Sequence, residues 1–355
     1  MRVGVPKETK PHEGRVALTP HACAPLVAAG HEVYVEKDGG RRSGYQDEAY
    51  QQAGVIILPD AKTLYATADI IVKVKEPAGV ELDYLQAHHL LFSFLHLAAN
   101  PSLAERLRKI GLTAFAFETL GENGEFPLLA PMSRIAGKIA VQIGAHLLHE
   151  PEGGSGVLLG GVADSEPGQV LVLGAGQAGS AAATVASALG ATVTVLDNNS
   201  ERLTGLQTKL PGLKLLNETG KELTNTVAGT DLLIGAIMVA GAKAPVIVSK
   251  DEVQQMRAGS VIVDIAIDQG GCVATSRPTD YNDPVYNEYG VQHCCVTNLP
   301  GAVPRTATQA LSARILPYLE TLLTGTWHNN APMLAALSVM EGRYQHPALI
   351  KQFVA

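Results

Sequence analysis

The sequence predicts an α/β protein made of two doubly wound parallel-sheet domains, and three observations support this class. Helix-like segments that end on glycine are followed by short β-branched or aromatic runs, which indicates alternating helices and strands. The chain has 355 residues, a length typical of about two domains. Of these residues 46% are hydrophobic, which provides enough apolar surface for two cores.

The helix-to-strand pattern occurs three times, in residues 26–35, 107–117 and 186–195. In each copy the glycine fits the left-handed position that follows a helix, and the run after it has the composition of a buried strand. The first helix also has a recognisable start, with Thr19 as the N-cap and Pro20 as the first helical residue. Each copy therefore predicts one helix and the strand that follows it.

The composition excludes several classes of function. The formal net charge is −7 and the basic residues form no run, so a nucleic-acid partner is not expected. Residues 1–6 lead directly into a strand and lack the basic and apolar regions of a signal peptide. The apolar stretch 232–239 is too short to span a bilayer. We expect a protein without a membrane partner.

The four cysteines, Cys23, Cys272, Cys294 and Cys295, lack the spacing of a zinc site. They are interpreted as reduced, mostly buried thiols, which are typical of a cytoplasmic protein. His146 and His149 lie one turn apart, but no carboxylate or cysteine nearby completes a set of metal ligands. We therefore expect a cytoplasmic protein without a bound metal.

The run Gln169–Gly179 predicts a buried strand that turns on glycines directly into a helix. At Gly174, Gly176 and Gly179 a pyrophosphate can approach the backbone closely, and the helix directs free N–H groups towards it. Asp197 follows about twenty residues later, where it can accept hydrogen bonds from an adenosine ribose. This combination predicts a Rossmann dinucleotide-binding domain; the alternative is a glycine-rich turn that binds nothing. We expect NAD rather than NADP, because Asp197 would repel a 2′-phosphate.

The segments between these units suggest how the domains are connected. Residues 133–148 predict a helix with a stripe of small residues, which we expect to contact another domain or a second subunit closely. Residues 151–168 predict a loop, and residues 307–324 a helix that packs back onto the first domain. We therefore expect the Rossmann domain, residues 131–304, to be inserted into a substrate domain of residues 1–130 and 305–355.

Polar side chains in apolar, strand-like segments mark a candidate catalytic site. In the first half these are Arg15, Lys75 and His96, and the latter two lie near predicted strand ends, where α/β proteins bind ligands. Each has a structural alternative, since a strand-end lysine is commonly solvated and a histidine among apolar residues is commonly a core residue. In the second half Asp264 lies within a predicted strand and Asp268 just beyond it, before glycines. Asp268 is the better catalytic candidate, whereas Asp264 is interpreted as structural, with backbone N–H groups or solvent as its partners.

Seven segments of the chain, matched in order, resemble the alanine dehydrogenase family that includes the nucleotide-binding subunit of proton-translocating transhydrogenase. The matched segments are residues 3–8, 15–20, 73–77, 128–133, 156–162, 263–272 and 298–306. The resemblance implies NAD-dependent oxidative deamination of L-alanine to pyruvate and ammonia, the reverse amination, and a homohexamer. A soluble transhydrogenase subunit and a non-catalytic NAD-binding protein are the two alternatives.

The resemblance also implies roles for individual residues. Arg15 and Lys75 bind the substrate, His96 is the general acid/base, and Asp268 helps to activate water. In addition to the glycines and Asp197, the cofactor contacts are Ser133, Asn298 and Leu299. Leu299 stands where the family often has methionine, and Phe94 where it commonly has tyrosine.

Overall fold

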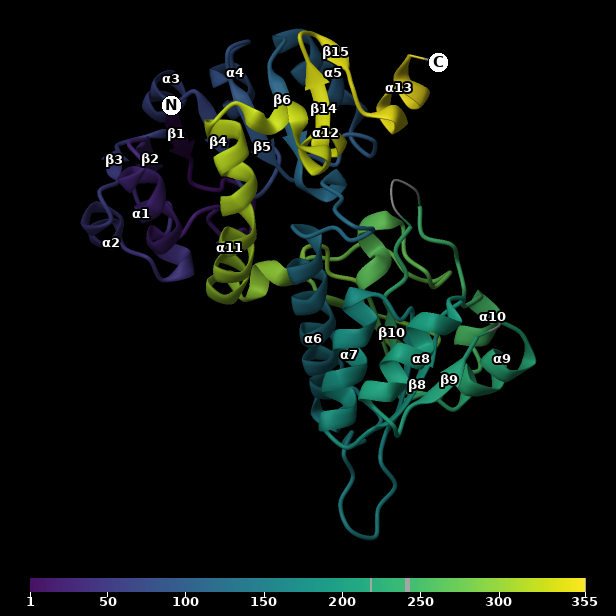
Figure 1. Ribbon diagram of the computed structural model, residues 1–355. Coiled ribbons are helices and arrows are strands. Elements are labelled where there is room, and N and C mark those ends of the chain that lie inside the picture. Colours follow the sequence, from purple (N-terminus) through teal and green to yellow (C-terminus); the bar gives the residue numbers. More distant parts are fainter. Residues whose placement is uncertain (218, 240–242, 355) are drawn as a thin grey trace. The chain divides into compact units, whose positions relative to one another are not determined.

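The computed structural model describes residues 1–217, 219–239 and 243–354. The chain forms two compact units, coloured along the sequence in Figure 1. Unit 1 comprises Met1–Met132 and Gly301–Ala355, and unit 2 comprises Ser133–Pro300. Within the described residues no helix combines the length and apolar character needed to cross a membrane.

Unit 1 contains an eight-stranded sheet with the order β15-β14-β6-β5-β4-β1-β2-β3 among the described residues. Strands β1 to β6 pair in parallel with one another, whereas β14 is antiparallel to both β6 and β15 at one edge. The strands are β1 (Arg2–Val5), β2 (Glu32–Glu36), β3 (Ile56–Leu58), β4 (Ile70–Val72), β5 (Leu90–Ser93), β6 (Thr113–Ala116), β14 (Leu337–Met340) and β15 (Arg343–Tyr344).

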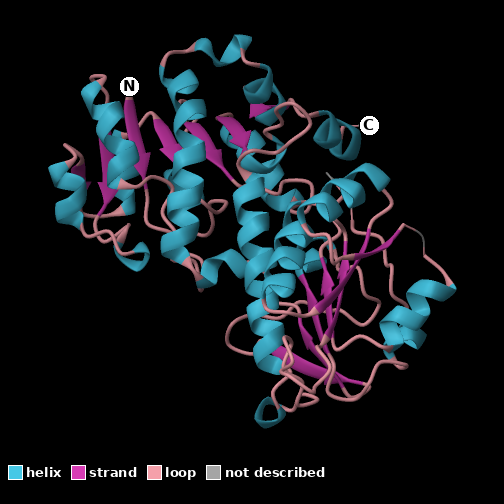
Figure 2. Ribbon diagram, turned by 60° about the horizontal axis from the view of Figure 1, so that its bottom comes forward, coloured by secondary structure: helices cyan, strands magenta, loops and turns pink. Residues whose placement is uncertain are grey.

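The helices of unit 1 lie on both faces of this sheet, as Figure 2 shows. They are α1 (Pro20–Ala28), α2 (Asp47–Gln52), α3 (Ala61–Thr67), α4 (Glu81–Tyr84), α5 (Pro101–Ile110), α11 (Pro304–Leu323), α12 (Ala331–Ala336) and α13 (Pro347–Phe353). The short 3-10 helix η2 (Phe117–Thr119) follows β6. The expectation that the last helical segment packs onto the first domain is confirmed, because α11 belongs to unit 1.

Unit 2 contains a seven-stranded sheet with the order β12-β13-β11-β10-β7-β8-β9 among the described residues. All neighbours are parallel except β12, which is antiparallel to β13. The strands are β7 (Gln169–Leu173), β8 (Thr192–Leu196), β9 (Lys214–Leu216), β10 (Leu232–Gly235), β11 (Val261–Asp264), β12 (Val285–Glu288) and β13 (Val291–Cys294). The helices are α6 (Leu129–Leu147), α7 (Gln177–Ala188), α8 (Ser200–Lys209), α9 (Lys221–Ala228) and α10 (Lys250–Val253). The prediction of two α/β domains, one inserted in the other, is confirmed.

The glycines that end the three predicted helices have left-handed backbones. Their φ angles are 85° at Gly30, 81° at Gly111 and 93° at Gly190, and β2, β6 and β8 follow directly. Thr19 caps α1, since its side chain accepts from the N–H of Ala22. The local sequence signals for these elements are therefore confirmed.

The stripe of small residues on α6 packs inside unit 2. A Cβ atom added to Gly137 would collide with the carbonyl of Ala178 on α7, and one added to Gly144 would collide with Leu232 on β10. Ala140, which lies between these two glycines on α6, is fully buried within this one chain. The expectation that this face contacts another domain or a second subunit is therefore wrong, because α7 and β10 of the same unit already cover it.

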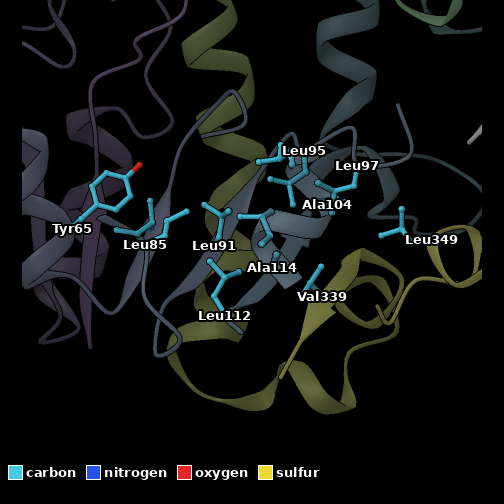
Figure 3. Packing of buried hydrophobic residues seen from close by; sticks show 14 of the residues in the cluster. Tyr65, Leu85, Leu91, Leu95, Leu97, Ala104, Leu112, Ala114, Val339 and Leu349 are labelled. Carbon is cyan, nitrogen blue, oxygen red and sulfur yellow. The ribbon is translucent and has the colours of Figure 1, made fainter. Parts of the chain in front are cut away.

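The core of unit 1 includes a cluster of leucines, alanines and a tyrosine on one side of its sheet, shown in Figure 3. Leu91 of β5 and Ala114 of β6 lie in this cluster, and so do Leu95 and Leu97, which follow β5. The core therefore anchors the chain on both sides of His96.

Candidate active site

A different feature of the structure explains why each of the three positions after β7 is a glycine. Gly174 is left-handed, with φ 101°, and a Cβ atom there would lie 2.8 Å from the carbonyl oxygen of Ala236. At Gly176, the N-cap of α7, an added Cβ would meet nothing within 4 Å. At Gly179 it would collide with the carbonyl of Gly174. Open space at the helix start and close packing behind it are the features that a pyrophosphate site needs.

Asp197 immediately follows β8 and faces this glycine turn. Its carboxylate accepts hydrogen bonds from the N–H of Ala175 (2.6 Å) and of Asn199 (2.8 Å). The same carboxylate thus holds the glycine turn, while the second lone pair of each oxygen can still accept from a ribose hydroxyl. The role of Asp197 in cofactor binding stays a prediction.

Asp264 ends β11, and Asp268 lies in the short 3-10 helix η4 (Ile265–Gln269) that follows. Asp264 is buried and accepts from the N–H groups of Ala266 (3.0 Å) and Cys272 (2.9 Å). Burial raises the pKa of Asp264, while hydrogen bonds from Ser276, Cys272 and Val273 act in the opposite direction. Asp264 therefore has a structural role, whereas Asp268 is exposed in the segment that follows, and its catalytic role stays a prediction.

The remaining predicted cofactor contacts, Ser133, Asn298 and Leu299, lie in unit 2. Ser133 is part of α6 and is half-buried. Asn298 has a left-handed backbone, with φ 65°. Leu299 is buried, and its carbonyl accepts from the hydroxyl of Tyr281 (2.9 Å). The strained backbone at Asn298 supports a functional turn, because such strain commonly occurs at binding sites.

In unit 1, Lys75 and His96 each lie three residues beyond one of two neighbouring parallel strands. The strands β4 and β5 are paired with Val72 opposite Phe92, and the pairing continues as the hydroxyl of Ser93 donates to the carbonyl of Lys75 (2.9 Å). His96 is exposed, which excludes its interpretation as a core histidine. The structure thus brings these two candidates to the same edge of one sheet.

Lys73 and Lys75 have different environments, although they are only two residues apart. Lys73 is buried, and its ammonium lies 2.8 Å from Glu81 and 3.8 Å from Glu8. Lys75 is half-buried, and no carboxylate in the described part of the chain pairs with its ammonium. Lys73 is therefore structural, and Lys75 is the lysine that can bind a ligand.

Arg15 is buried and held by Glu13. The Nε atom of Arg15 donates to Glu13 (2.7 Å), one terminal nitrogen makes a further short ion pair with it, and the backbone N–H of Arg15 also donates to it (3.0 Å). The Nη1 atom donates to the sulfur of Met132 (3.2 Å), which is a weak acceptor. A substrate carboxylate can replace the sulfur there and gain a stronger, charge-assisted hydrogen bond.

Three glutamates around these residues were missed in the sequence analysis. Glu13 holds Arg15, Glu8 accepts from the backbone N–H groups of Val74 (2.6 Å) and Lys75 (3.2 Å), and Glu118 binds the backbone at His96. Burial raises the pKa of Glu8 to about 7. No local signal marked these residues, because Glu8 and Glu13 lie in the polar segment 7–14 and the partners of Glu118 are more than twenty residues away in the sequence.

His146 and His149 lie next to each other near the end of α6. The imidazole of His146 lies 3.6 Å from the carboxylate of Glu152, and its ring contacts His149 edge-on. In the residues that the structure describes, no three His, Cys, Asp or Glu side chains gather closely enough to hold a metal ion.

The fold and these residues define a class of protein, an α/β dehydrogenase with an inserted Rossmann domain. Two family models match the chain. The model for the N-terminal domain of alanine dehydrogenase/PNT matches residues 4–136, and the model for the C-terminal domain matches residues 140–347. The chain therefore belongs to the alanine dehydrogenase/PNT family.

Individual relatives agree with this assignment. The chain is 44% identical to alanine dehydrogenases of Halomonas elongata and Bacillus subtilis, covering 99% of this chain in both cases and 97% and 94% of those proteins. A solved L-alanine dehydrogenase is 46% identical, with a TM-score of 0.96 over 100% of this chain and 99% of that chain. A transhydrogenase from Sinorhizobium meliloti is 25% identical, with a TM-score of 0.84 over 98% of this chain and 100% of that chain. The transhydrogenase is thus a more distant relative.

Proposed function

We propose that this chain is an NAD-dependent alanine dehydrogenase, which converts L-alanine, NAD and water to pyruvate, ammonium, NADH and a proton, and catalyses the reverse amination. The observation that carries the proposal is the identity of 44% to alanine dehydrogenases over nearly the full length, combined with the functional groups placed in both units. We assign substrate binding to unit 1 and NAD binding to unit 2.

The residues of unit 2 fit the cofactor. The open space at Gly176, at the start of α7, can accept a pyrophosphate, and Asp197 can accept from the adenosine ribose. Bound NAD supplies the hydride acceptor. Ser133, Asn298 and Leu299 are proposed as further contacts to it.

The residues of unit 1 bind and orient the amino acid. Arg15, fixed by Glu13, binds the substrate carboxylate through Nη1, and the ammonium of Lys75 binds the oxygen of the pyruvate carbonyl. Both cations favour an anionic substrate and stabilise negative charge on oxygen as it develops. The backbone N–H groups of Arg15 and Lys75 donate to carboxylates, so the positions of both residues are set before the substrate binds.

Proton transfer is assigned to His96 and Asp268. Loss of hydride from the α-carbon leaves an iminium, which water attacks before ammonia departs. His96 is exposed, and an imidazole can both accept and donate a proton, so it can take the proton from the attacking water and return one to the leaving nitrogen. Asp268 orients that water.

A steady-state assay of NADH formation across small L-amino acids tests the proposal. L-Alanine should give the highest kcat/KM, and ammonium with pyruvate should oxidise NADH. Absence of turnover with L-alanine, together with hydride exchange between two nicotinamide nucleotides, would instead favour the transhydrogenase function.

The assembly and location are proposals of the same kind. The family resemblance supports a homohexamer, and four free, buried cysteines support a reducing cytoplasmic environment. Light scattering of the purified protein tests the first, since a monomer mass would contradict it. Fractionation of the source cells tests the second.

A further inference from the structure

The backbone at His96 adopts a conformation that non-glycine residues seldom use. Its φ angle is 48°, whereas Leu95 before it and Leu97 after it are buried in the core. Figure 3 shows these two leucines within the hydrophobic cluster. A left-handed residue persists only where the surrounding structure holds it. The presentation of the imidazole therefore depends on whatever fixes this turn.

The carbonyl of His96 accepts from the N–H groups of Ala99 (3.0 Å) and Asn100 (3.1 Å), and Glu118 binds the N–H side of the turn. One carboxylate oxygen accepts from the N–H of Leu95 (3.1 Å), and the other accepts from the N–H of His96 (2.6 Å). Two successive backbone N–H groups in a turn form a concave site for an anion, and hydrogen bonds to a carboxylate are stronger than those to a neutral acceptor. Both oxygens of Glu118 are thus used to bind the residue that presents the imidazole and the residue before it.

The fold brings Glu118 to this position through two paired strands. Ser93 of β5 lies opposite Ala116 of β6, so the segments that carry His96 and Glu118 leave the sheet side by side. Phe117, next to Glu118, is buried, and its ring packs edge-on against Phe94, with 5.1 Å between ring centroids. Glu118 is therefore itself held by the core.

Phe94 adds a second constraint on the histidine. Its ring is nearly parallel to the imidazole of His96, at an interplanar angle of 4° and a centroid distance of 6.0 Å. The contact with Phe94 restrains the orientation of the imidazole ring, whereas Glu118 restrains the backbone at Leu95 and His96. Since Phe94 cannot bind the N–H groups, it cannot replace Glu118.

We propose that Glu118 is a positioning residue for His96, which it holds in the left-handed turn through two backbone hydrogen bonds. The inference rests on the proposed role of His96 in proton transfer. Glutamine at this position has one accepting oxygen, and its NH₂ group would face the second N–H. The turn would then lose one hydrogen bond, and the imidazole would move away from the reacting atoms. A displacement of about 1 Å can lower a rate roughly hundredfold.

The test compares the full-length wild-type protein with Glu118→Gln, His96→Ala and the double variant. Glu118→Gln should lower kcat by roughly ten- to a hundredfold while the Kd for NADH stays unchanged. The double variant should have the kcat of His96→Ala alone, because Glu118 acts through the imidazole. Glu118→Asp keeps both oxygens on a shorter side chain and should recover part of the kcat. Glu105→Gln is the matched control, since Glu105 pairs with Arg108 on the surface of the same unit.

The NMR signal of the His96 ring, identified by its absence in His96→Ala, provides a readout that does not depend on turnover. The signal should shift in Glu118→Gln and stay in place in Glu105→Gln. An unshifted signal, a wild-type kcat in Glu118→Gln, or a double variant that loses the full factors of both single changes would overturn the proposal. A wild-type protein inactive on L-alanine would instead refute the proposed function, and the NMR shift would still decide whether Glu118 positions His96.

Discussion

The two units place their functional groups by opposite means. Unit 1 uses carboxylates that bind the backbone next to each candidate residue: Glu13 at Arg15, Glu8 at Lys75 and Glu118 at His96. Unit 2 places the pyrophosphate site by omitting side chains, since its glycines leave space at the start of α7 and allow close packing behind it.

The difference follows from the ligands that each unit is proposed to bind. A small amino acid offers few atoms, so its orientation depends on individual cations and an imidazole at fixed positions. A pyrophosphate binds backbone N–H groups at a helix start, so the site depends on the backbone path. Changes in unit 1 should therefore act on kcat or substrate affinity, and changes in unit 2 on cofactor affinity.

The largest effect is expected for His96→Ala in unit 1. Loss of acid/base transfer should lower kcat roughly a hundredfold or more, while NAD affinity stays nearly unchanged. Stopped-flow or steady-state turnover with L-alanine, together with NADH fluorescence titration, measures the two quantities. Near-normal turnover would exclude His96 from the chemistry.

A pair of glycine variants sharpens the account of unit 2. Gly179→Ala would force a Cβ against the carbonyl of Gly174 and should cost about 1–3 kcal/mol of unfolding free energy. The methyl group of Gly176→Ala would contact no protein atom, so the melting temperature should stay unchanged. NAD affinity should fall, because this methyl group would occupy the space for the pyrophosphate. Calorimetry and NAD titration on both variants distinguish the two roles. Equal loss of stability in both would contradict the assignment of Gly176 to the ligand.

A smaller effect, about tenfold, is expected on the preference for NAD over NADP. Asp197→Ala removes the carboxylate that repels a 2′-phosphate and that holds Ala175, so NAD affinity should fall and the ratio of kcat/KM for NAD over NADP should drop by about tenfold. The measurement is kcat/KM with each cofactor. If the wild-type protein already used NADP as well as NAD, Asp197 would not be the selector.

A further prediction for unit 1 concerns the pH dependence of its stability. Burial raises the pKa of Glu8 from 4.5 to about 7, so between these values the folded state binds more protons than the unfolded state. The contribution of Glu8 to the unfolding free energy is therefore present below pH 4.5 and is lost as the pH rises through about 7. Glu8→Gln should flatten the stability curve in this window, as measured by denaturant unfolding at several pH values.

The control for that experiment is Glu105→Gln. Arg108 lowers the pKa of Glu105 to about 2, so its contribution is lost only as the pH falls below 4.5. An unchanged slope in Glu8→Gln, or an equal change in both variants, would contradict the role of burial at Glu8.

Much of the site could be predicted because its signals are local. The glycine turn after β7 needs only the residues from Gln169 to Gly179, and Asp268 could be proposed as a candidate from its place after a strand and before glycines. Glu118 could not be recognised in this way. Its partners, Leu95 and His96, are more than twenty residues away in the sequence, and only the pairing of β5 with β6 brings them within hydrogen-bond distance.

The sequence by itself determined the alternation of helices and strands, the helix ends at glycine and the glycine turn after β7, because these depend on backbone preferences within a few residues. The tertiary structure alone decided how Lys73 and Lys75 differ. A strand period of two would place both on one face, but β4 ends at Val72, and beyond it burial and the carboxylates of Glu8 and Glu81 separate them. Likewise α7 and β10 decided what covers the small face of α6. Side-chain burial and pairing depend on residues distant in sequence, which a local pattern cannot specify.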